Sequence, residues 1–268
     1  MTTDPGGAPI ELNTHLPHPA RIYDYLLGGK TNFAADREMA ELALSHMPEL
    51  QVGARANRRF MVRAVRFLAG TGVRQFVDIG AGVPTSPNVH EVAQAVAPDA
   101  RVVYVDNDPI VLVHGRALLA GPGPGATAVV HADLRDTVAL LGHPELTNVI
   151  DFDQPVAILL VAVLHLILDA DDPGGIVARM MEPAAPGSYL VLSHGARDLN
   201  EERGAALRKA ISSHGTLSAR RHEEVLRFFD GLDLVEPGLV QLPRWRPDGE
   251  VEEGSDNVAL WAGVARKG

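Results

Sequence analysis

The chain has 268 residues, 46% of them hydrophobic, and a formal net charge of −10 at pH 7. This length fits one large α/β domain with an appendage, or two small domains, and the apolar content supports a sizeable core, which excludes general disorder. The absence of cysteine excludes disulfides, thiolate metal sites and a cysteine nucleophile, and the negative charge disfavours nonspecific binding of nucleic acid, whose phosphates it repels on average.

The N-terminal stretch does not have the pattern of a signal peptide. Residues 1–20 hold four prolines, and no basic start precedes an apolar segment. The longest apolar run, residues 156–168, is interrupted by His165 and is too short to span a bilayer. We therefore expect a cytoplasmic protein that does not associate with membranes.

Helices are predicted ahead of the first strand. Apolar side chains recur at helical spacing in three segments, which are residues 20–27, 34–45 and 54–68. The pattern of strands begins only after these helices. We interpret residues 1–70 as an N-terminal extension and helical cap, and residues 71–268 as the main domain.

A glycine pair, Gly28-Gly29, follows the first of these helices, with Tyr23 before it and Asn32 just beyond it. Two interpretations stay open: a lid that closes over a bound ligand, or an amphipathic helix with ordinary caps. The third helix carries arginines at positions 55, 58, 59, 63 and 66. We favour a solvated helix face for these arginines, and a site for an acidic or phosphorylated acceptor is the alternative.

Short, continuous apolar runs then alternate with helical segments. Strands are predicted at residues 75–79, 101–105, 127–131, 156–161 and 189–193, and helices at 89–96 and 110–119. Continuous apolar strands separated by helices indicate a parallel sheet that is covered on both faces. Residues 232–236 and 258–264 are two more predicted strands with no helix between them, which indicates a terminal antiparallel hairpin at the sheet edge.

Acidic residues stand at the ends of the first three strands, at Asp78, Asp106 and Asp133. Ligands of such sheets bind beyond the carboxyl ends of the strands, so we expect these carboxylates to line one site. Gly80 and Gly82 permit a tight turn and the close approach of a ligand. Because an acid after the second strand can accept hydrogen bonds from a ribose diol, the set predicts a nucleoside site.

Two nucleoside cofactors use this arrangement. A dinucleotide requires the third glycine of G-x-G-x-x-G, and that position is Thr85. S-adenosylmethionine carries no phosphate, and its amino group needs an acceptor near the first turn, where Asp78 stands. The sequence therefore favours S-adenosylmethionine over NAD. The histidines show no H-E-x-x-H or similar spacing, so no metal is predicted.

The segments that carry these residues resemble a known family. VDIGAG, VVYVDNDP and HADLRD resemble the first three motifs of class I S-adenosylmethionine-dependent methyltransferases. The longer segments HPARIYDYLLGGKTNFAADR, ARANRRFMVRAVRFL, QFVDIGAGVPTSPNVHEVAQ, VVYVDNDPIVLVHGRALL and GSYLVLSH are similar to the bacterial S-adenosyl methyltransferase family formerly catalogued as a domain of unknown function. This resemblance runs from about Asn13 to the last strand. The chain departs from the general methyltransferase turn at Pro84, where a third glycine would stand.

The resemblance implies an α/β, Rossmann-like class I methyltransferase fold, with a mostly parallel seven-stranded sheet, a C-terminal antiparallel hairpin and an N-terminal helical cap. Together with the strand ends it predicts the cofactor-binding residues Tyr23, Asn32, Asp78, Gly80, Ala81, Gly82, Asp106, Asn107, Asp133, Leu134 and Ala162. His165, after the fourth strand, is the candidate general base. The alternative, which we favour, is a histidine that packs beneath the cofactor.

The predicted function is S-adenosylmethionine-dependent methyl transfer to a small molecule that the sequence does not identify. Pyrimidine methylation of the thiolate type needs a cysteine, and residues 161–165 lack the polar-Pro-Pro-aromatic loop of DNA amino-methyltransferases. A binding module that senses S-adenosylmethionine without turnover is one alternative. An NAD-dependent oxidoreductase is another, which Thr85 and Asp78 disfavour.

Overall fold

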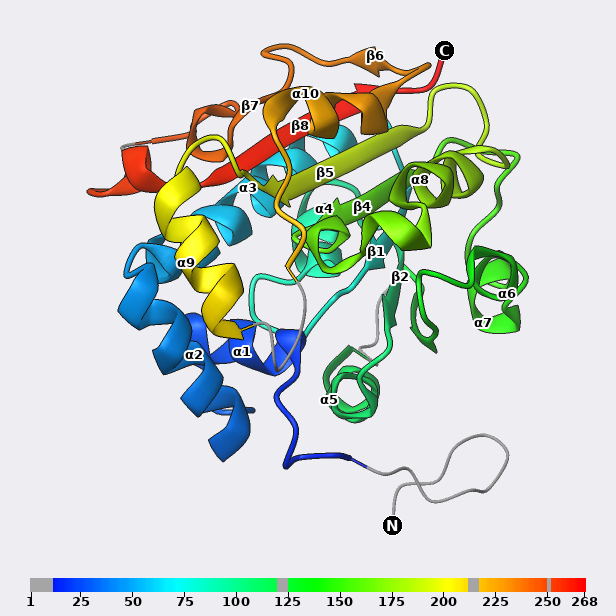
Figure 1. Cartoon of the computed structure of the whole chain (residues 1–268). Coiled ribbons are helices and arrows are strands. Elements are labelled where there is room, and N and C mark those ends of the chain that lie inside the picture. The colour runs from blue at the N-terminus through cyan, green and yellow to red at the C-terminus, as the bar shows by residue number, and fades with distance from the viewer. Residues whose placement is uncertain (1–11, 120–124, 212–216, 250–251) are drawn as a thin grey trace.

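The computed structural model describes residues 12–119, 125–211, 217–249 and 252–268, so the first part of the expected N-terminal extension lies outside the described residues. The centre of the molecule is a single sheet with helices on both faces (Figure 1). Its strands follow the order β3-β2-β1-β4-β5-β8-β6, and β7 also pairs with β8. The predicted α/β fold is confirmed.

Parallel strands form the larger part of the sheet. They are β1 (Gln75–Ile79), β2 (Arg101–Asp106), β3 (Thr127–His131), β4 (Ala157–Val161) and β5 (Tyr189–Gly195). Every residue of β1 is buried. A central strand that is covered on both faces needs apolar side chains on both, which is why these strands have continuous apolar sequences.

The C-terminal strands are antiparallel, as predicted. β8 (Leu260–Arg266) pairs with β5 along its whole length, and β6 (Asp233–Leu234) and β7 (Val240–Gln241) pair with β8. In the described part of the chain the sheet has eight strands in place of the expected seven, because the chain between β6 and β8 adds the short strand β7. Strands of two residues leave no periodic pattern in a sequence.

Two large hydrophobic clusters lie on the two faces of the sheet. The helices are α1 (Pro19–Leu26), α2 (Ala34–His46), α3 (Leu50–Gly70), α4 (Val89–Val96), α5 (Pro109–Leu119), α6 (Thr137–Leu141), α7 (Pro144–Thr147), α8 (Pro173–Met181), α9 (Glu201–Ile211) and α10 (His222–Leu226). α3 and α4 pack on one face, and α6, α7, α8 and α10 pack on the other. α3 is therefore part of the main core.

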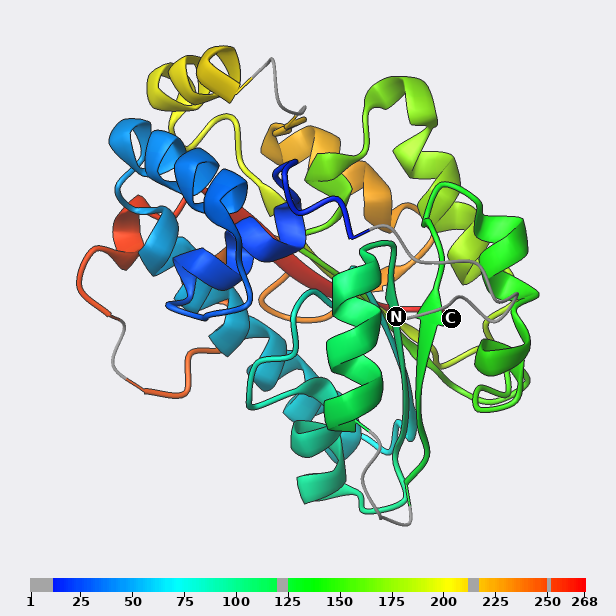
Figure 2. The same cartoon turned by 90° about the horizontal axis from the view of Figure 1, so that it is seen from below.

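A third layer stands beside the carboxyl ends of the strands. It consists of α1 and α2 together with α9, which comes from the second half of the chain; α2 in blue and α9 in yellow lie side by side in Figures 1 and 2. Ala43, Met47 and Leu207 form a small hydrophobic cluster between α2 and α9 that is separate from the two large ones. We call these three helices the cap.

A partly buried chain of hydrogen bonds joins the cap to the sheet. The Ala162 N–H donates to Ser193 Oγ over 2.9 Å, and the Ser193 hydroxyl donates to Asn57 Oδ1 over 2.6 Å. The Asn57 Nδ2 group donates to the Tyr23 hydroxyl over 2.9 Å, which donates to the Ala54 carbonyl over 3.0 Å. Every group in this series has a partner, so the series positions α1 on α3 and on the sheet.

We expect Ser193→Ala to lower the free energy of unfolding by about 1–3 kcal/mol, because Asn57 Oδ1 would stay buried without its donor. Urea denaturation measures this change. Ser45→Ala is the matched control, since the exposed Ser45 hydroxyl bonds only within and next to its own helix turn; we expect its effect to stay below about 0.5 kcal/mol. A comparable loss in the two variants would contradict the role given to Ser193.

Candidate functional site

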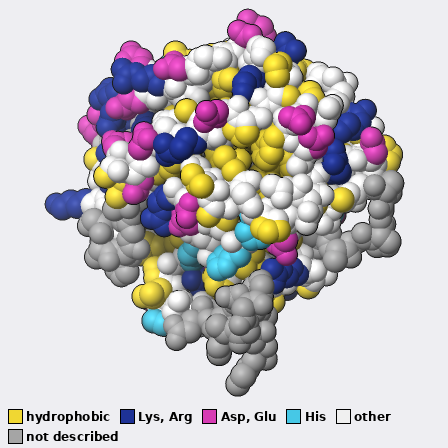
Figure 3. All heavy atoms as spheres, turned by 90° about the vertical axis from the view of Figure 1, so that its right-hand side faces the viewer, with side chains coloured by type: hydrophobic (Ala, Val, Ile, Leu, Met, Phe, Trp, Pro, Cys, Tyr) yellow, Lys and Arg dark blue, Asp and Glu magenta, His cyan; other side chains and the backbone are white. Residues whose placement is uncertain are grey.

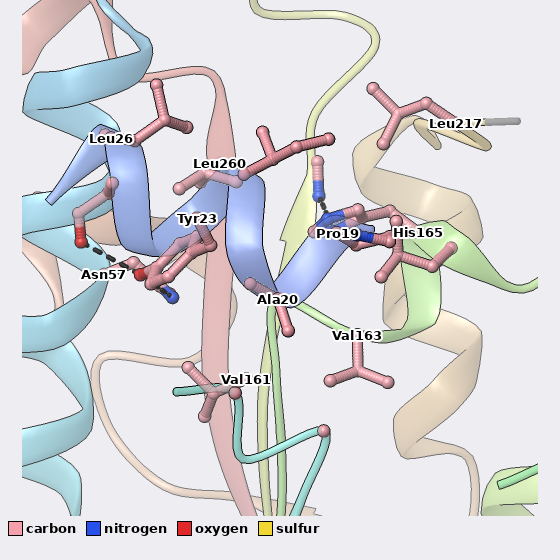
Figure 4. Close-up of a pocket in the computed structure, with 18 of the residues that line it drawn as sticks. Pro19, Ala20, Tyr23, Leu26, Asn57, Val161, Val163, His165, Leu217 and Leu260 are labelled. Carbon is pink, nitrogen blue, oxygen red and sulfur yellow. Dashed lines mark hydrogen bonds between the residues drawn. The ribbon is translucent and has the colours of Figure 1, made fainter. Parts of the chain in front are cut away.

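A cavity of about 570 Å³ opens at the carboxyl ends of β1, β2 and β4 and continues between α1, α2, α3 and α9. Figure 4 shows α1 crossing it, with Tyr23 on the side of α3 and His165 on the other. Nearly all predicted site residues line this one cavity, namely Tyr23, Asp78, Gly80, Ala81, Gly82, Asp106, Asn107, Asp133, Leu134, Ala162 and His165. The three strand-end carboxylates therefore converge. A volume of this size is typical of small-molecule and cofactor sites.

The two glycines after β1 serve different purposes. Both have a left-handed backbone, with φ +67° at Gly80 and +68° at Gly82. A Cβ on Gly80 would lie 2.3 Å from Val163 Cγ2, whereas a Cβ on Gly82 would meet nothing within 4 Å. Gly80 thus allows β1 and the segment after β4 to pack closely. Gly82 lines the cavity without a side chain, so a ligand can approach its backbone.

Asp106 is buried and has a fixed orientation. Its Oδ2 accepts the Gly82 N–H over 2.8 Å, and its Oδ1 accepts the Asp108 N–H over 2.9 Å. A carboxylate has about four acceptor sites, so Asp106 can still accept hydrogen bonds from a diol in the cavity. The two backbone contacts hold it ready to do so.

Asp133 is already paired with a neighbouring side chain. Arg135 donates to both of its oxygens and lowers its pKa to about 2. Asn107 Nδ2 lies 3.4 Å from Asp133 Oδ2, and the buried side chain of Leu134 completes this wall. This rim of the cavity therefore combines an apolar surface with polar groups of small net charge.

Asp78 is a buried carboxylate that faces the cavity. Its side chain is 7% exposed, lines the cavity, and has no hydrogen-bond partner within the described part of the chain. Burial raises its pKa to about 7; Arg58 opposes this rise and Asp106 adds to it. A cationic group that entered the cavity would favour the ionised form.

Arg58 stands beside Asp78 and is a site residue that sequence reasoning missed. Its Nη2 donates to the carbonyls of Thr85 and Pro87, each over 2.6 Å, and so holds the loop after the glycine turn. The side chain also lines the cavity. An ammonium and a carboxylate on one ligand can pair with Asp78 and Arg58 respectively.

The interpretation of the five arginines as one solvated face needs correction. Arg55 and Arg59 pair with Glu252 and Arg66 with Asp248, but Arg63 is buried and donates to the Trp245 carbonyl. The helical spacing of α3 is the sequence signal that could have distinguished Arg58 from the other four arginines. The cavity-facing residues of α3 recur at helical spacing, at Leu50, Gly53, Ala54, Asn57, Arg58 and Met61.

His165 presents a hydrogen-bond donor to the cavity. Its Nδ1 accepts the Gly195 N–H over 3.3 Å (Figure 4), and a backbone N–H can only donate. Burial, together with the charge of Arg220, lowers the pKa of His165 to about 4. The ring is therefore neutral near pH 7 and carries its proton on Nε2, which has no hydrogen-bond partner among the described residues.

The residues packed behind His165 explain why its ring stays neutral. Arg220 is 6% exposed and donates to His194 Nε2 over 2.9 Å and to the Leu164 carbonyl over 3.1 Å. Asp169 pairs with the same guanidinium over 2.6 Å. His194 is fully buried, and burial lowers its pKa well below the usual value. This buried cation near two neutral histidines opposes protonation of His165.

Asn32 does not line the cavity, in contrast to the prediction that it contacts the cofactor. Its Nδ2 donates to Asp24 Oδ2 over 2.8 Å and to the Gly29 carbonyl over 3.0 Å. Asp24 also accepts the Thr31 N–H over 2.9 Å, so this aspartate organises the loop after α1. Asn32 shapes that loop, and α1 itself faces the cavity.

The start of α1 is anchored to the turn after β2. His18 Nδ1 and Arg21 Nε lie 3.0 Å and 3.1 Å from Asp108 Oδ2, and the Asp108 side chain is 2% exposed. Tyr23 is held by its bonds to Asn57 and Ala54. α1 is thus attached at both sides of the cavity that it covers.

Residues 12–119, 125–211, 217–249 and 252–268 contain no cluster of three or more histidine, aspartate or glutamate side chains with the arrangement of a metal site. Within the same ranges, every helix is too short or too polar to traverse a lipid bilayer.

The chain is similar to known proteins in sequence and in fold. The family model described as S-adenosyl methyltransferase matches residues 5–268. A DUF574-family protein from Streptomyces avermitilis MA-4680 is 45% identical, with a TM-score of 0.93 over 96% of this chain and 100% of that chain. A methyltransferase candidate from Thermobifida fusca YX is 43% identical, with a TM-score of 0.89 over 98% of this chain and 97% of that chain.

A more distant structure shares only the fold. The plantazolicin methyltransferase BpumL, solved in complex with SAH, is 10% identical, with a TM-score of 0.52 over 93% of this chain and 95% of that chain. The search of curated proteins finds no match.

The neutral state of His165 can be tested by nitrogen NMR of the imidazole rings. Because its pKa is lowered to about 4, we expect Nε2 to stay protonated and Nδ1 to stay bare from pH 8 down to about pH 5. Loss of the signals in His165→Gln assigns them. A proton found on Nδ1 in this range would restore the general-base interpretation.

The buried carboxylate of Asp78 is expected to destabilise the ligand-free protein. Its folded pKa of about 7 lies above the unfolded value of about 3.9, so the native state holds the extra proton between these values and loses stability as the pH rises. We expect Asp78→Asn to be more stable than the wild type at pH 8 by up to about 4 kcal/mol, with a smaller difference at pH 5. Urea denaturation at both pH values measures this.

Asp99→Asn is the control for this comparison, because its side chain is 72% exposed and pairs only at the surface with Arg74. Its stability should follow that of the wild type at both pH values. Equal stability of Asp78→Asn and the wild type at pH 8 would show that the Asp78 carboxylate is well solvated or paired.

Proposed function

Since the chain belongs to the S-adenosyl methyltransferase family, whose cofactor is S-adenosyl-L-methionine, we propose that it methylates a small molecule held under the cap. The observation that carries the proposal is the continuity of the cavity. One space of about 570 Å³ runs from the strand-end residues Asp78, Gly82 and Asp106 to the apolar inner surfaces of α1, α2 and α9. Such a space can receive two ligands end to end.

The residues at the strand ends fit the cofactor. Asp78 would accept hydrogen bonds from its ammonium group and Arg58 would pair with its carboxylate, while Asp106 would accept the ribose hydroxyls. The unpartnered, buried carboxylate of Asp78 supports this assignment most directly. Ala81, Gly82, Asn107, Asp133, Leu134 and Ala162 would supply the remaining walls, as expected from the sequence.

The residues of this chain supply orientation and exclude water. When bound, the cofactor supplies an electrophilic methyl group on a sulfonium. A displacement of this kind depends on alignment, which can contribute roughly 7–11 kcal/mol at the favourable limit. α1 shields the reaction space, and His165 would hold a polar group of the acceptor by donating from Nε2. We therefore assign His165 a positioning role in place of the role of general base.

The cap is proposed to consist of α1, α2 and α9, in place of residues 1–70. α3 packs on the sheet, and α9 packs on α2 although it lies far along the chain. The expected lid is accordingly α1, held by Asp108 on one side and by Asn57 on the other. Residues 28–32 form its exit loop.

The distribution of surface charge favours a small acceptor over nucleic acid. On the face shown in Figure 3, acidic and basic side chains are interspersed, and no broad basic area gathers there. The net charge of −10 also opposes binding to nucleic acid.

The dinucleotide alternative is disfavoured at the start of α4. A pyrophosphate would need free N–H groups and positive potential at this helix terminus. Instead the carboxylate of Glu91, in the first turn, accepts the Asn88 N–H, and the Thr85 N–H donates to Asn88 Oδ1. Glu91 would repel a pyrophosphate.

Calorimetry with S-adenosylmethionine tests the cofactor site. We expect affinity to fall as the pH drops through about 7, because protonation of Asp78 removes the negative charge that would attract the ammonium group. Asp78→Asn should bind roughly tenfold or more weakly at pH 8, with little dependence on pH, since it loses a charge-assisted hydrogen bond. Asp99→Asn should bind as the wild type does. Tighter binding of NAD than of S-adenosylmethionine would refute the assignment.

Turnover separates an enzyme from a sensor. Incubation of the protein with S-adenosylmethionine and a panel of small metabolites should release S-adenosylhomocysteine with at least one of them. Binding of the cofactor with neither transfer to any acceptor nor slow hydrolysis would favour the sensor.

A further inference from the structure

The part of the cavity under the cap has an apolar wall. It is lined by Leu26, Met39, Ala43, Met47, Leu207 and Ile211, and we call it the cap chamber. Met39 and Ala43 on α2 and Met47 at its C-cap recur four positions apart, so they form one stripe that faces α9. An apolar wall of this kind selects a ligand with an apolar body.

The acidic side chain that lines this region is already neutralised. Glu49 accepts from Asn200 Nδ2 over 2.8 Å and from Arg203 Nη1 over 3.2 Å, and its side chain is 10% exposed. It therefore offers no free negative charge to a cationic ligand.

The basic side chain of the cap chamber, Arg208, is not paired in this way. Arg208 lines the cavity from α9 and is partly buried, and it has neither an ion pair nor a hydrogen bond within the described part of the chain. A guanidinium next to an apolar wall favours an anionic partner.

Gly204 gives the Arg208 side chain room to lie along the wall. It stands one turn earlier on α9 and also lines the cavity. A Cβ at this position would lie 3.3 Å from Arg208 Nη1, which is a tight contact.

We propose that the methyl acceptor is an apolar acid with a single carboxylate that pairs with Arg208 and a polar group that accepts from His165 Nε2. This inference rests on the proposed function. Among the described residues that line the cap chamber, Arg208 is the cation without an ion pair, and a single guanidinium suits a carboxylate, which it can bind through two hydrogen bonds, better than a doubly charged phosphate. His165 lies two residues after Val163, whose side chain packs against Gly80 of the glycine turn, and it lines the same cavity as the residues of the cap chamber.

The test measures ligand binding to the protein saturated with S-adenosylhomocysteine. Calorimetry compares benzoate, 2-naphthoate, indole-3-acetate and decanoate, each with its neutral primary amide. We expect at least one carboxylate to bind about tenfold or more tightly than its amide in the wild type, and this preference to vanish in Arg208→Gln. Arg227→Gln is the matched control, because Arg227 is exposed, does not line the cavity and has no partner among the described residues.

The affinity for S-adenosylhomocysteine should be the same in all three proteins, which shows that the variants are folded and the cofactor site is intact. Normal binding of S-adenosylhomocysteine without any preference for a carboxylate, or with a preference that survives in Arg208→Gln, would overturn this inference alone. Failure of the wild type to bind S-adenosylhomocysteine would overturn the proposed function and this inference with it.

Discussion

The hydrogen-bond series from Ala162 through Ser193 and Asn57 to Tyr23 is the interaction on which the site depends. It begins at the end of β4, crosses to α3 and ends on α1, so it links the sheet to the helix that covers the cavity. Ala162 has φ +61°, an unfavourable backbone for a residue with a Cβ, and its N–H is held by Ser193. The same hydrogen bonds thus hold both the turn at Ala162 and the cap.

The site also keeps features that lower the stability of the fold. Asp78 is a buried carboxylate with no hydrogen-bond partner among the described residues, and Gly80 and Gly82 lose more conformational entropy on folding than other residues would. The two large hydrophobic clusters on the sheet offset such losses, because they surround the strands whose ends carry these residues. These destabilising residues lie at the strand ends, where a bound ligand would offset the stability that they cost.

The strands and their terminal acids could be predicted because their signals are local: an apolar run, then an acid, then a turn. The parallel order follows from the helices between them. Arg58 was not predicted because its role depends on which face of α3 meets the cavity. The place of α9 in the cap depends on contacts with α2, more than a hundred residues earlier, that no local pattern encodes. Asn32 was misplaced because Asp24, eight residues before it, takes its amide.

The turn after β2 shows why the cofactor residues and the cap cannot be varied independently. Asp106 faces the cavity, and two residues later Asp108 points to α1, where His18 and Arg21 pair with it. The Asp108 N–H donates to the Asp106 carboxylate, so one short segment orients both acids. A shift of α1 would pull on Asp108 and through its backbone on Asp106. The position of the cap over the cavity and the orientation of the diol acceptor are therefore set by the same turn.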